Sequence, residues 1–218
     1  MTDPNYSALL IVLDRSGSMS SIRDDMVGGL EQMLREQAAQ PGMLTVDVVI
    51  FDNEIEHTHS FAAPSDVRIE LVPRGGTALY DAIGIAVNGF GQALAALPEH
   101  ARPSTVQVVV VTDGFENASR EYTAATIQRL IAEQRQQFSW DFLFLGADQD
   151  AVLAAADLGI AADRSMTFAR GSHNVDAMVG SVSRHLTQVR RHEAAAGFTE
   201  AERDAAIRSD DDEHEHGR

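Results

Sequence analysis

The sequence predicts a three-layer α/β domain with a mostly parallel, doubly wound sheet and helices on both of its faces. Apolar runs of strand length alternate with segments of helical period almost to residue 196, which is the pattern of such folds. Two runs, 8–13 and 106–111, are apolar almost throughout, as expected of central strands buried on both faces. Asp14 follows the first run and Asp113 follows the second. We therefore expect both aspartates at the carboxyl edge of the sheet, where ligands bind in open α/β folds.

The first part of the chain is expected to hold three strands and one helix. After the strand at 8–13, apolar side chains recur at helical spacing from about 21 to 40, and Pro41-Gly42 ends that helix. Runs at 44–51 and 55–61 are typical of strands, and the short link between them predicts an antiparallel hairpin. The polar alternation of the second run indicates a half-exposed edge strand.

The rest of the chain alternates in the same way. Helices are expected after 75–77 and at about 123–136, 151–158 and 175–191, and strands at 106–111, 140–145 and 166–168. Trp140, Phe142 and Phe144 alternate along one of these strands, which favours packing in the core over a stacking platform for nucleic-acid bases. The domain is therefore expected to span residues 1–196.

Length and composition narrow the class of protein. The 218 residues, with a mass of 23.6 kDa, suit one sizeable domain. The 33 acidic and 17 basic residues give a net charge of −16, which disfavours nucleic acid and anionic membranes as partners. The absence of cysteine excludes disulfides and thiolate metal sites. The start of the chain has neither a basic segment nor a long apolar run, so we expect a soluble, cytoplasmic protein.

Residues 197–218 are expected to form an acidic, flexible tail. Beyond Gly197, eight acidic residues stand against three arginines, a composition typical of a solvated segment. His214 and His216 lie in this tail and could chelate a metal loosely, but solvated side chains are the favoured interpretation.

The residues around the two strand-terminal aspartates are rich in oxygen donors. Asp14 is followed by hydroxyl side chains at alternate positions, Ser16 and Ser18. Thr77, after a double glycine, and Asp113 bring further oxygens from separate loops. Each of these residues alone also suits a helix cap or a turn. Together they predict a site for a small divalent cation, because such cations prefer hard oxygen ligands.

Several neighbours of these residues could support the site. Glu116 and Asn117 are expected either to hold the metal loop through hydrogen bonds or to form an ordinary polar loop tip. Asp52 ends the second strand, and a turn role is favoured over a place in the site. This acidic protein is expected to repel an acidic partner unless the metal site, or a local cationic patch such as Arg15 and Arg74, overcomes the repulsion.

The combined pattern resembles a known family. Asp-x-Ser-x-Ser at 14–18, Gly-Gly-Thr at 75–77 and Thr-Asp-Gly at 112–114 resemble the metal-ion-dependent adhesion site (MIDAS) of von Willebrand factor A (vWA) domains. The resemblance covers roughly residues 7–196, and the segment 113–119 looks like that of small stand-alone bacterial members. It implies a Rossmann-like fold with six strands in the order 3-2-1-4-5-6, in which strand 3 is the antiparallel edge strand.

The resemblance also implies a function. Ser16, Ser18 and Thr77 would offer hydroxyl oxygens to the cation, while Asp14 and Asp113 would bind it directly or through water. The expected cation is Mg²⁺ or Mn²⁺, with Ca²⁺ a poorer fit. An Asp or Glu carboxylate of a partner protein would complete the coordination. We therefore expect a non-catalytic protein-binding module that uses neither nucleic acid nor a membrane.

Two other classes of function compete with this expectation. A Mg²⁺-dependent phosphohydrolase of the haloacid dehalogenase type also has an aspartate at the end of a strand, but it needs a second aspartate where Ser16 stands. The sequence also lacks a Gly-x-Ser-x-Gly elbow and a His-Glu-x-x-His motif. The third class is an accessory subunit of an AAA+ ATPase or of a stress or defence complex, which would still use the metal-dependent contact.

Overall fold

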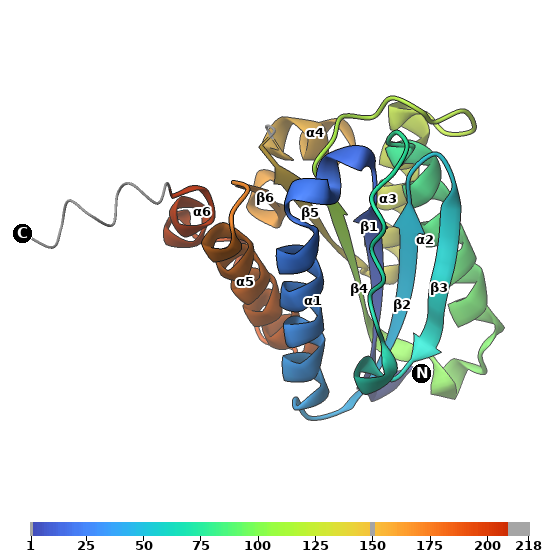
Figure 1. Ribbon diagram of the computed structural model, residues 1–218. Coiled ribbons are helices and arrows are strands. Elements are labelled where there is room, and N and C mark those ends of the chain that lie inside the picture. The colour runs from blue at the N-terminus through green and yellow to red at the C-terminus, as the bar shows by residue number, and fades with distance from the viewer. Residues whose placement is uncertain (1, 149–150, 209–218) are drawn as a thin grey trace, which may run out of the picture.

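The computed structural model of the protein describes residues 2–148 and 151–208 (Figure 1). Its sheet has six strands in the order β3-β2-β1-β4-β5-β6. All neighbouring strands pair in parallel except β2 and β3, which are antiparallel. The strands are β1 (Asp3–Asp14), β2 (Met43–Phe51), β3 (Ile55–Ala62), β4 (Pro103–Thr112), β5 (Asp141–Ala147) and β6 (Ser165–Phe168). The predicted strand order and the antiparallel edge strand are confirmed.

Helices cover both faces of this sheet. They are α1 (Arg23–Ala38), α2 (Leu79–Ala96), α3 (Ala124–Phe138), α4 (Ala151–Asp157), α5 (Ser172–Arg190) and α6 (Glu200–Ile207). In Figure 1, α1, α5 and α6 lie on the side toward the viewer, and α2, α3 and α4 lie behind the sheet. Among the described residues, no helix is long and apolar enough to cross a bilayer.

Burial on both faces explains why residues 8–13 of β1 are all apolar. Leu9, Ile11 and Leu13 belong to the core between the sheet and α1 and α5. Leu10 and Val12 point the other way, into the core beneath α2 and α3. A strand buried on both faces has no solvent side on which polar residues would be stable. The prediction of a central, doubly covered strand is confirmed.

The register of the central strands positions the candidate site. Leu13 in β1 lies beside Val111 in β4, so both strands end at the same edge of the sheet. Asp14 and Asp113 therefore leave the sheet side by side, although they are far apart in sequence. Phe51, the last residue of β2, pairs with Asp14 on the other side. The loop after β2 consequently joins the same edge.

The structure differs from the expected solvated tail at residues 198–207. Phe198 is 6% exposed and Ala206 is fully buried in the core beside α5 and β6. The backbone amide of Ala169 donates to the carbonyl oxygen of Ala206 at 2.8 Å. Phe198 and Ala206 therefore belong to the core of the domain, and the expected boundary after residue 196 separates α6 from the domain on which it packs.

Charge pairing also holds α6 in place. Thr199 and Glu202 form a capping box, each side chain accepting from the backbone amide of the other. The Glu202 carboxylate also accepts two hydrogen bonds from the Arg184 guanidinium of α5, at 2.5 and 2.9 Å. Glu202 therefore both caps α6 and attaches this helix to α5. The last part of the expected tail, 209–218, lies outside the described residues.

Removing residues 198–218 is expected to destabilise the domain by about 3 kcal/mol or more. The deletion takes the Phe198 side chain out of the core and removes α6 with its contacts to α5. The control is removal of 209–218 alone, compared by thermal unfolding at one pH. The longer deletion should have a clearly lower midpoint than the shorter one. Equal midpoints would show that α6 contributes nothing to the stability of the domain.

Candidate metal centre

Three loops meet at the carboxyl edge of β1 and β4. The first loop follows β1 and contains a short 3-10 helix, Gly17–Ser21. The second carries the Gly-Gly-Thr segment and joins the first through a hydrogen bond from the amide of Gly17 to the carbonyl of Gly75, at 3.3 Å. The third follows β4 and contains Asp113. These contacts bring residues from distant parts of the sequence to one place.

The Asp14 carboxylate lies at the bottom of the site and is fully buried. Its Oδ1 accepts a hydrogen bond from the amide of Ser16 at 2.6 Å, and its Oδ2 accepts one from the Thr112 hydroxyl at 2.7 Å. Burial raises the pKa of Asp14 to about 6; the charge of Asp113 adds to this rise, and hydrogen bonds from Thr112 and Ser16 oppose it. The carboxylate is thus desolvated and only partly compensated by the protein.

The Asp113 carboxylate faces the serine hydroxyls. Its Oδ1 accepts hydrogen bonds from Ser18 Oγ at 2.6 Å and from Ser16 Oγ at 3.4 Å, and the two hydroxyl oxygens lie 3.0 Å apart. Its Oδ2 is buried and accepts no hydrogen bond from any residue that the structure describes. A buried carboxylate oxygen that accepts no hydrogen bond is costly, and a cation bound beside it would remove this cost.

Thr77 reaches the same point from the second loop. Asn117 holds this loop through two hydrogen bonds of 3.0 Å. Its side-chain Oδ1 accepts from the backbone amide of Thr77, and its backbone amide donates to the Thr77 carbonyl. The position of the Thr77 hydroxyl is shown by Gly114. A Cβ atom there would lie 2.9 Å from Thr77 Oγ1, 3.7 Å from Ser18 Oγ and 3.8 Å from Ser16 Oγ. Three hydroxyl oxygens therefore surround one small space beside Gly114.

The structure brings together all five residues that the sequence analysis selected. The donor set consists of two carboxylates and three hydroxyls, which are hard oxygen ligands suited to Mg²⁺ or Mn²⁺. Within 2–148 and 151–208, no group of three or more His, Cys, Asp or Glu side chains could hold a metal. Binding at this site would therefore depend on the hydroxyls as well as on the carboxylates.

Glu116 and Asn117 both act as loop supports. The Glu116 carboxylate accepts from the amides of Tyr80, Ala118 and Ser119 at 2.8 to 3.0 Å, which ties the loop after β4 to the start of α2. Asn117 holds Thr77, as described above. The interpretation that these residues position the site through hydrogen bonds is therefore favoured over that of a plain loop tip.

Asp81 supports the same loop, and sequence reasoning missed it. Its carboxylate accepts three backbone hydrogen bonds from residues 120–122, at 2.7 to 2.9 Å. These bonds, aided by the charge of Arg120, outweigh burial and lower the pKa of Asp81. Its position in the first turn of α2 suggests only a helix-dipole role from the sequence.

The expected arginine patch takes a different form. Asp52 accepts from the amide of Glu54 at 2.7 Å, which confirms its turn role, and it also pairs with Arg74 at 2.7 Å and Arg15 at 3.4 Å. Arg15 has a second partner in Glu56 at 2.8 Å, and Arg74 has one in Glu54 at 2.6 Å. Each guanidinium thus faces two carboxylates, so the pair does not present the free positive charge that was expected.

A different arginine lies at the site. Arg170, in the loop between β6 and α5, places its Nη2 3.1 Å from Asp113 Oδ2. Its Nη1 donates to the carbonyl of Ser18 at 2.8 Å. Nothing in the local sequence distinguishes Arg170 from the other arginines, because its role depends on where β6 ends.

Comparisons with known proteins define the fold. No protein-family model and no curated protein match the chain by sequence. Solved structures match in shape: the vWF domain of the type V pili tip protein Mfa5 from Porphyromonas gingivalis aligns with a TM-score of 0.61 and 11% identity, covering 88% of this chain and 98% of that one. A von Willebrand factor type A structure from Catenulispora acidiphila aligns at 0.56 and 18%, covering 84% and 43%. The chain has the vWA fold.

Another vWA neighbour is proximal thread matrix protein 1 (PTMP1) from the mussel byssus, with a TM-score of 0.63 and 12% identity over 84% of this chain. A second PTMP1 structure, with zinc in its MIDAS motif, aligns at 0.62 and 14% over 85%. The chain spans 47% of the PTMP1 chain in both alignments.

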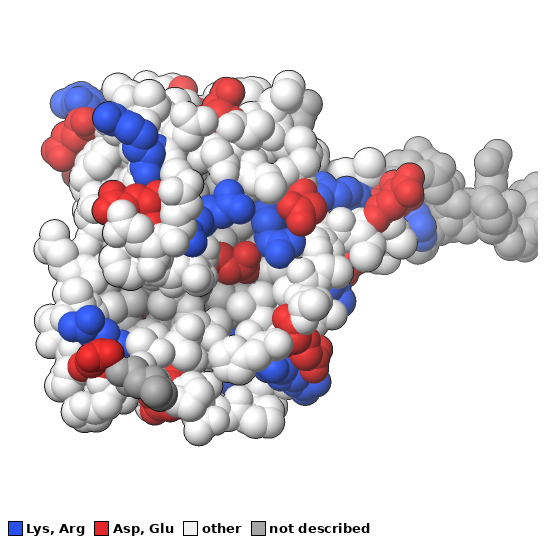
Figure 2. Space-filling model, turned by 180° about the vertical axis from the view of Figure 1, so that it is seen from behind, with Lys and Arg blue, Asp and Glu red and all other residues white. Residues whose placement is uncertain are grey.

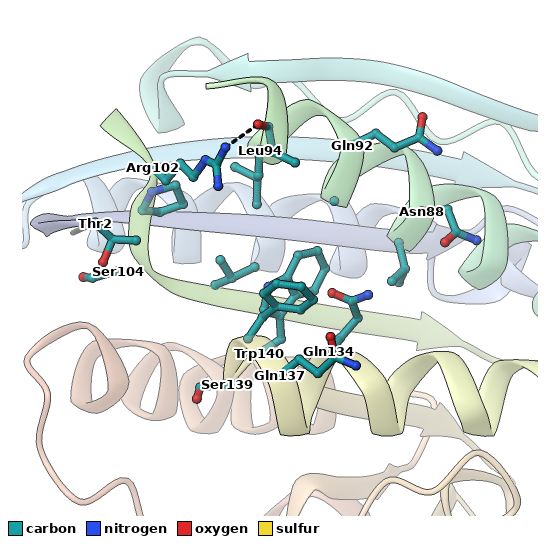
Figure 3. Close-up of a pocket in the computed structure, with 16 residues that line it drawn as sticks. Thr2, Asn88, Gln92, Leu94, Arg102, Ser104, Gln134, Gln137, Ser139 and Trp140 are labelled. Atoms are coloured by element: carbon teal, nitrogen blue, oxygen red, sulfur yellow. Dashed lines mark hydrogen bonds between the residues drawn. The ribbon is translucent and has the colours of Figure 1, made fainter. Parts of the chain in front are cut away.

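The domain also has a cavity of about 580 Å³ at the opposite end of the sheet (Figure 3). It lies between α2 and α3, and Trp140 lines it at the start of β5. Its carboxamides come from both helices: Asn88, Gln92, Gln134 and Gln137. Its charged lining residue, Arg102, donates to two backbone carbonyls. No candidate metal ligand is among its lining residues, so this cavity is separate from the site.

Figure 2 shows the face of the domain that is turned away from the viewer in Figure 1. Arginine and acidic side chains lie on it in small mixed groups, and most of the surface is uncharged. A nucleic-acid backbone would find no continuous basic surface on this face.

The affinity of the candidate site for a divalent cation is expected to fall as the pH drops below about 6. The pKa of Asp14 is raised to about 6, so protons compete with a cation for this carboxylate below that pH and not above it. Manganese titrations at about pH 5 and about pH 7.5 would check this. An affinity that stays constant across this range would show that Asp14 takes no part in binding.

Proposed function

We propose that this vWA domain is a non-catalytic protein-binding module that recognises an acidic residue of a partner through a divalent cation. The cation would be Mg²⁺ or Mn²⁺, held by the five oxygen donors: Asp14, Ser16, Ser18, Thr77 and Asp113. The observation that carries the proposal is the convergence of three hydroxyls beside Gly114 and next to a buried carboxylate oxygen without a hydrogen bond.

Some residues of the site supply negative charge, and others orient the carboxylates or add neutral ligands. Asp14 and Asp113 supply the two negative charges, and Thr112 and Ser18 fix their directions by hydrogen bonds. Ser16, Ser18 and Thr77 add neutral ligands, so the protein provides no third negative charge in the cluster. A divalent cation bound there supplies an open coordination position that favours an anionic oxygen.

Structures of the same fold support this proposal. PTMP1 holds zinc in its MIDAS motif, which agrees with a divalent cation at this edge of the sheet. Mfa5 is a pili tip protein and PTMP1 is a matrix protein, which agrees with a role in protein association. The residues here favour Mg²⁺ or Mn²⁺ over zinc, since the donor set contains neither histidine nor thiolate.

The chemistry of the site favours binding over turnover. A phosphohydrolase of the kind considered above needs a nucleophilic carboxylate and a second aspartate as acid or base, and Ser16 occupies the second position. Both oxygens of Asp14 accept hydrogen bonds at the bottom of the site, which makes this carboxylate a poor nucleophile. We therefore propose no catalytic role.

Affinity capture from a lysate of the source organism tests the proposal. The domain would be used with Mg²⁺, with EDTA, and as the Asp14→Asn variant with Mg²⁺, followed by mass spectrometry. A partner retained only by the magnesium-loaded wild type, and released when its acidic contact residue is replaced by the amide, is the expected result. Partners retained equally in all three samples would contradict a metal-dependent contact.

A further inference from the structure

Arg170 is the cationic side chain that contacts the candidate metal ligands, and the proposed function leaves its role open. We propose that Arg170 is a fixed positive charge that weakens binding of the divalent cation and strengthens binding of the partner's carboxylate. This inference rests on the proposed function, because it concerns the same site.

The guanidinium of Arg170 is held by bonds that do not involve Asp113. Its Nε donates to Asp148 Oδ2 at 2.5 Å, and its Nη1 donates to the Ser18 carbonyl at 2.8 Å and to the Ser21 hydroxyl at 3.0 Å. Nη2 then lies 3.1 Å from Asp113 Oδ2 without a hydrogen bond between them. Because three other bonds fix the group, it is expected to stay in place when a cation enters.

The local charges show what this position does. Asp14 and Asp113 carry two negative charges, which a divalent cation would balance. Arg170 adds one positive charge, so the loaded site has a net charge of about +1. Asp148 pairs with Arg170 from the solvent side, but its side chain is 47% exposed, so water screens much of its charge. A site with this balance matches the single negative charge of one carboxylate.

The acidity of the chain makes such a charge useful. With a net charge of −16, the protein repels an acidic partner over distances comparable to the screening length. Arg15 and Arg74 do not offset this repulsion, because each already faces two carboxylates. The side chain of Arg170 is 30% exposed, so its charge lies beside the site and at the surface, where it can attract an anion. Arg170 therefore takes the role that the sequence analysis expected of the other two arginines.

Arg170→Gln tests the inference, because it removes the charge and keeps a hydrogen-bonding side chain. Arg170→Lys keeps the charge and serves as the conservative variant. Arg184→Gln is the matched control. Arg184 lies on α5, its side chain is 31% exposed, and it also pairs with a carboxylate. Mn²⁺ affinity would be measured by electron paramagnetic resonance. Acetate affinity would be measured from the relaxation of its methyl protons by protein-bound Mn²⁺.

The two measurements are expected to move in opposite directions. Arg170→Gln should bind Mn²⁺ roughly tenfold more tightly and acetate roughly fourfold more weakly. The positive charge that it removes repels a divalent cation more strongly than it attracts a monovalent anion. Arg170→Lys and Arg184→Gln should stay close to wild type in both. A purely structural role would instead weaken both affinities in Arg170→Gln.

Three results would overturn the inference. Unchanged affinities in Arg170→Gln, or a loss of both, with normal Mn²⁺ binding by the wild type would overturn the role of Arg170 and leave the proposed function intact. No Mn²⁺ binding by the wild type would overturn the proposed function and the inference together.

Discussion

Asp14→Asn is expected to abolish divalent-cation binding and to stabilise the metal-free protein. The variant removes one of the two charges of the site, so Mn²⁺ affinity should fall by at least about 100-fold. The fold is expected to remain intact, because Asn can keep both contacts of Asp14. Its Oδ1 can accept from Ser16, and its Nδ2 can donate to the Thr112 hydroxyl, which can turn to donate to Gly114, 3.1 Å away.

The gain in stability follows from the pKa of Asp14. Folding raises this pKa from 3.8 to about 6, so the ionised carboxylate costs stability above about pH 6 and the cost disappears below the unfolded pKa. The expected gain from Asp14→Asn at pH 7 is on the order of 1–3 kcal/mol. Thermal unfolding of both proteins without metal would check this. The gain should vanish near about pH 4, and a variant less stable than wild type at pH 7 would contradict the explanation.

Gly114→Ala is expected to weaken cation binding without replacing any proposed ligand. The new Cβ would lie 2.9 Å from Thr77 Oγ1, closer than real Cβ contacts, so the threonine must move. Asn117 holds the backbone of Thr77, so the clash displaces the hydroxyl and not the loop. Because cation binding depends on the positions of the hydroxyl ligands, we expect Mn²⁺ affinity to fall by at least about tenfold.

Gly89→Ala is the matched control for this prediction. Gly89 lies in α2, and a Cβ there would meet no atom within 4 Å. This variant should keep wild-type Mn²⁺ affinity and gain up to about 1 kcal/mol of stability from better helix propensity. If Gly114→Ala bound Mn²⁺ as wild type does, the hydroxyls could not be gathered around a cation at that position.

Much of the fold could be predicted because burial leaves a period in the sequence. The continuous apolar run of β1 reflects two covered faces, and the polar alternation of β3 reflects a sheet edge. The tail was predicted less well. Its acidic composition hid Phe198 and Ala206, yet the capping box formed by Thr199 and Glu202 is a local signal that could have revealed α6.

The candidate site could also be predicted from the sequence only in part. Its five proposed ligands could be found because parallel strands end at one edge, which places Asp14 beside Asp113 whatever the rest of the fold does. Arg170 could not be found, because its contact with Asp113 depends on the path of the loop after β6. Arg15 was misjudged because its carboxylate partners come from β3 and from the loop before it, and only the folded hairpin brings them near.

The most direct test of the central claim is a Mn²⁺ titration of wild type, Thr77→Ala and Thr77→Ser by electron paramagnetic resonance. Within the described part of the chain, the Thr77 side chain makes no hydrogen bond, so Thr77→Ala removes a proposed ligand and little else. Wild type and Thr77→Ser should bind one Mn²⁺ with similar affinity, and Thr77→Ala should bind it at least about tenfold more weakly. Equal binding by all three proteins, or none by the wild type, would contradict a cation held where the three loops meet.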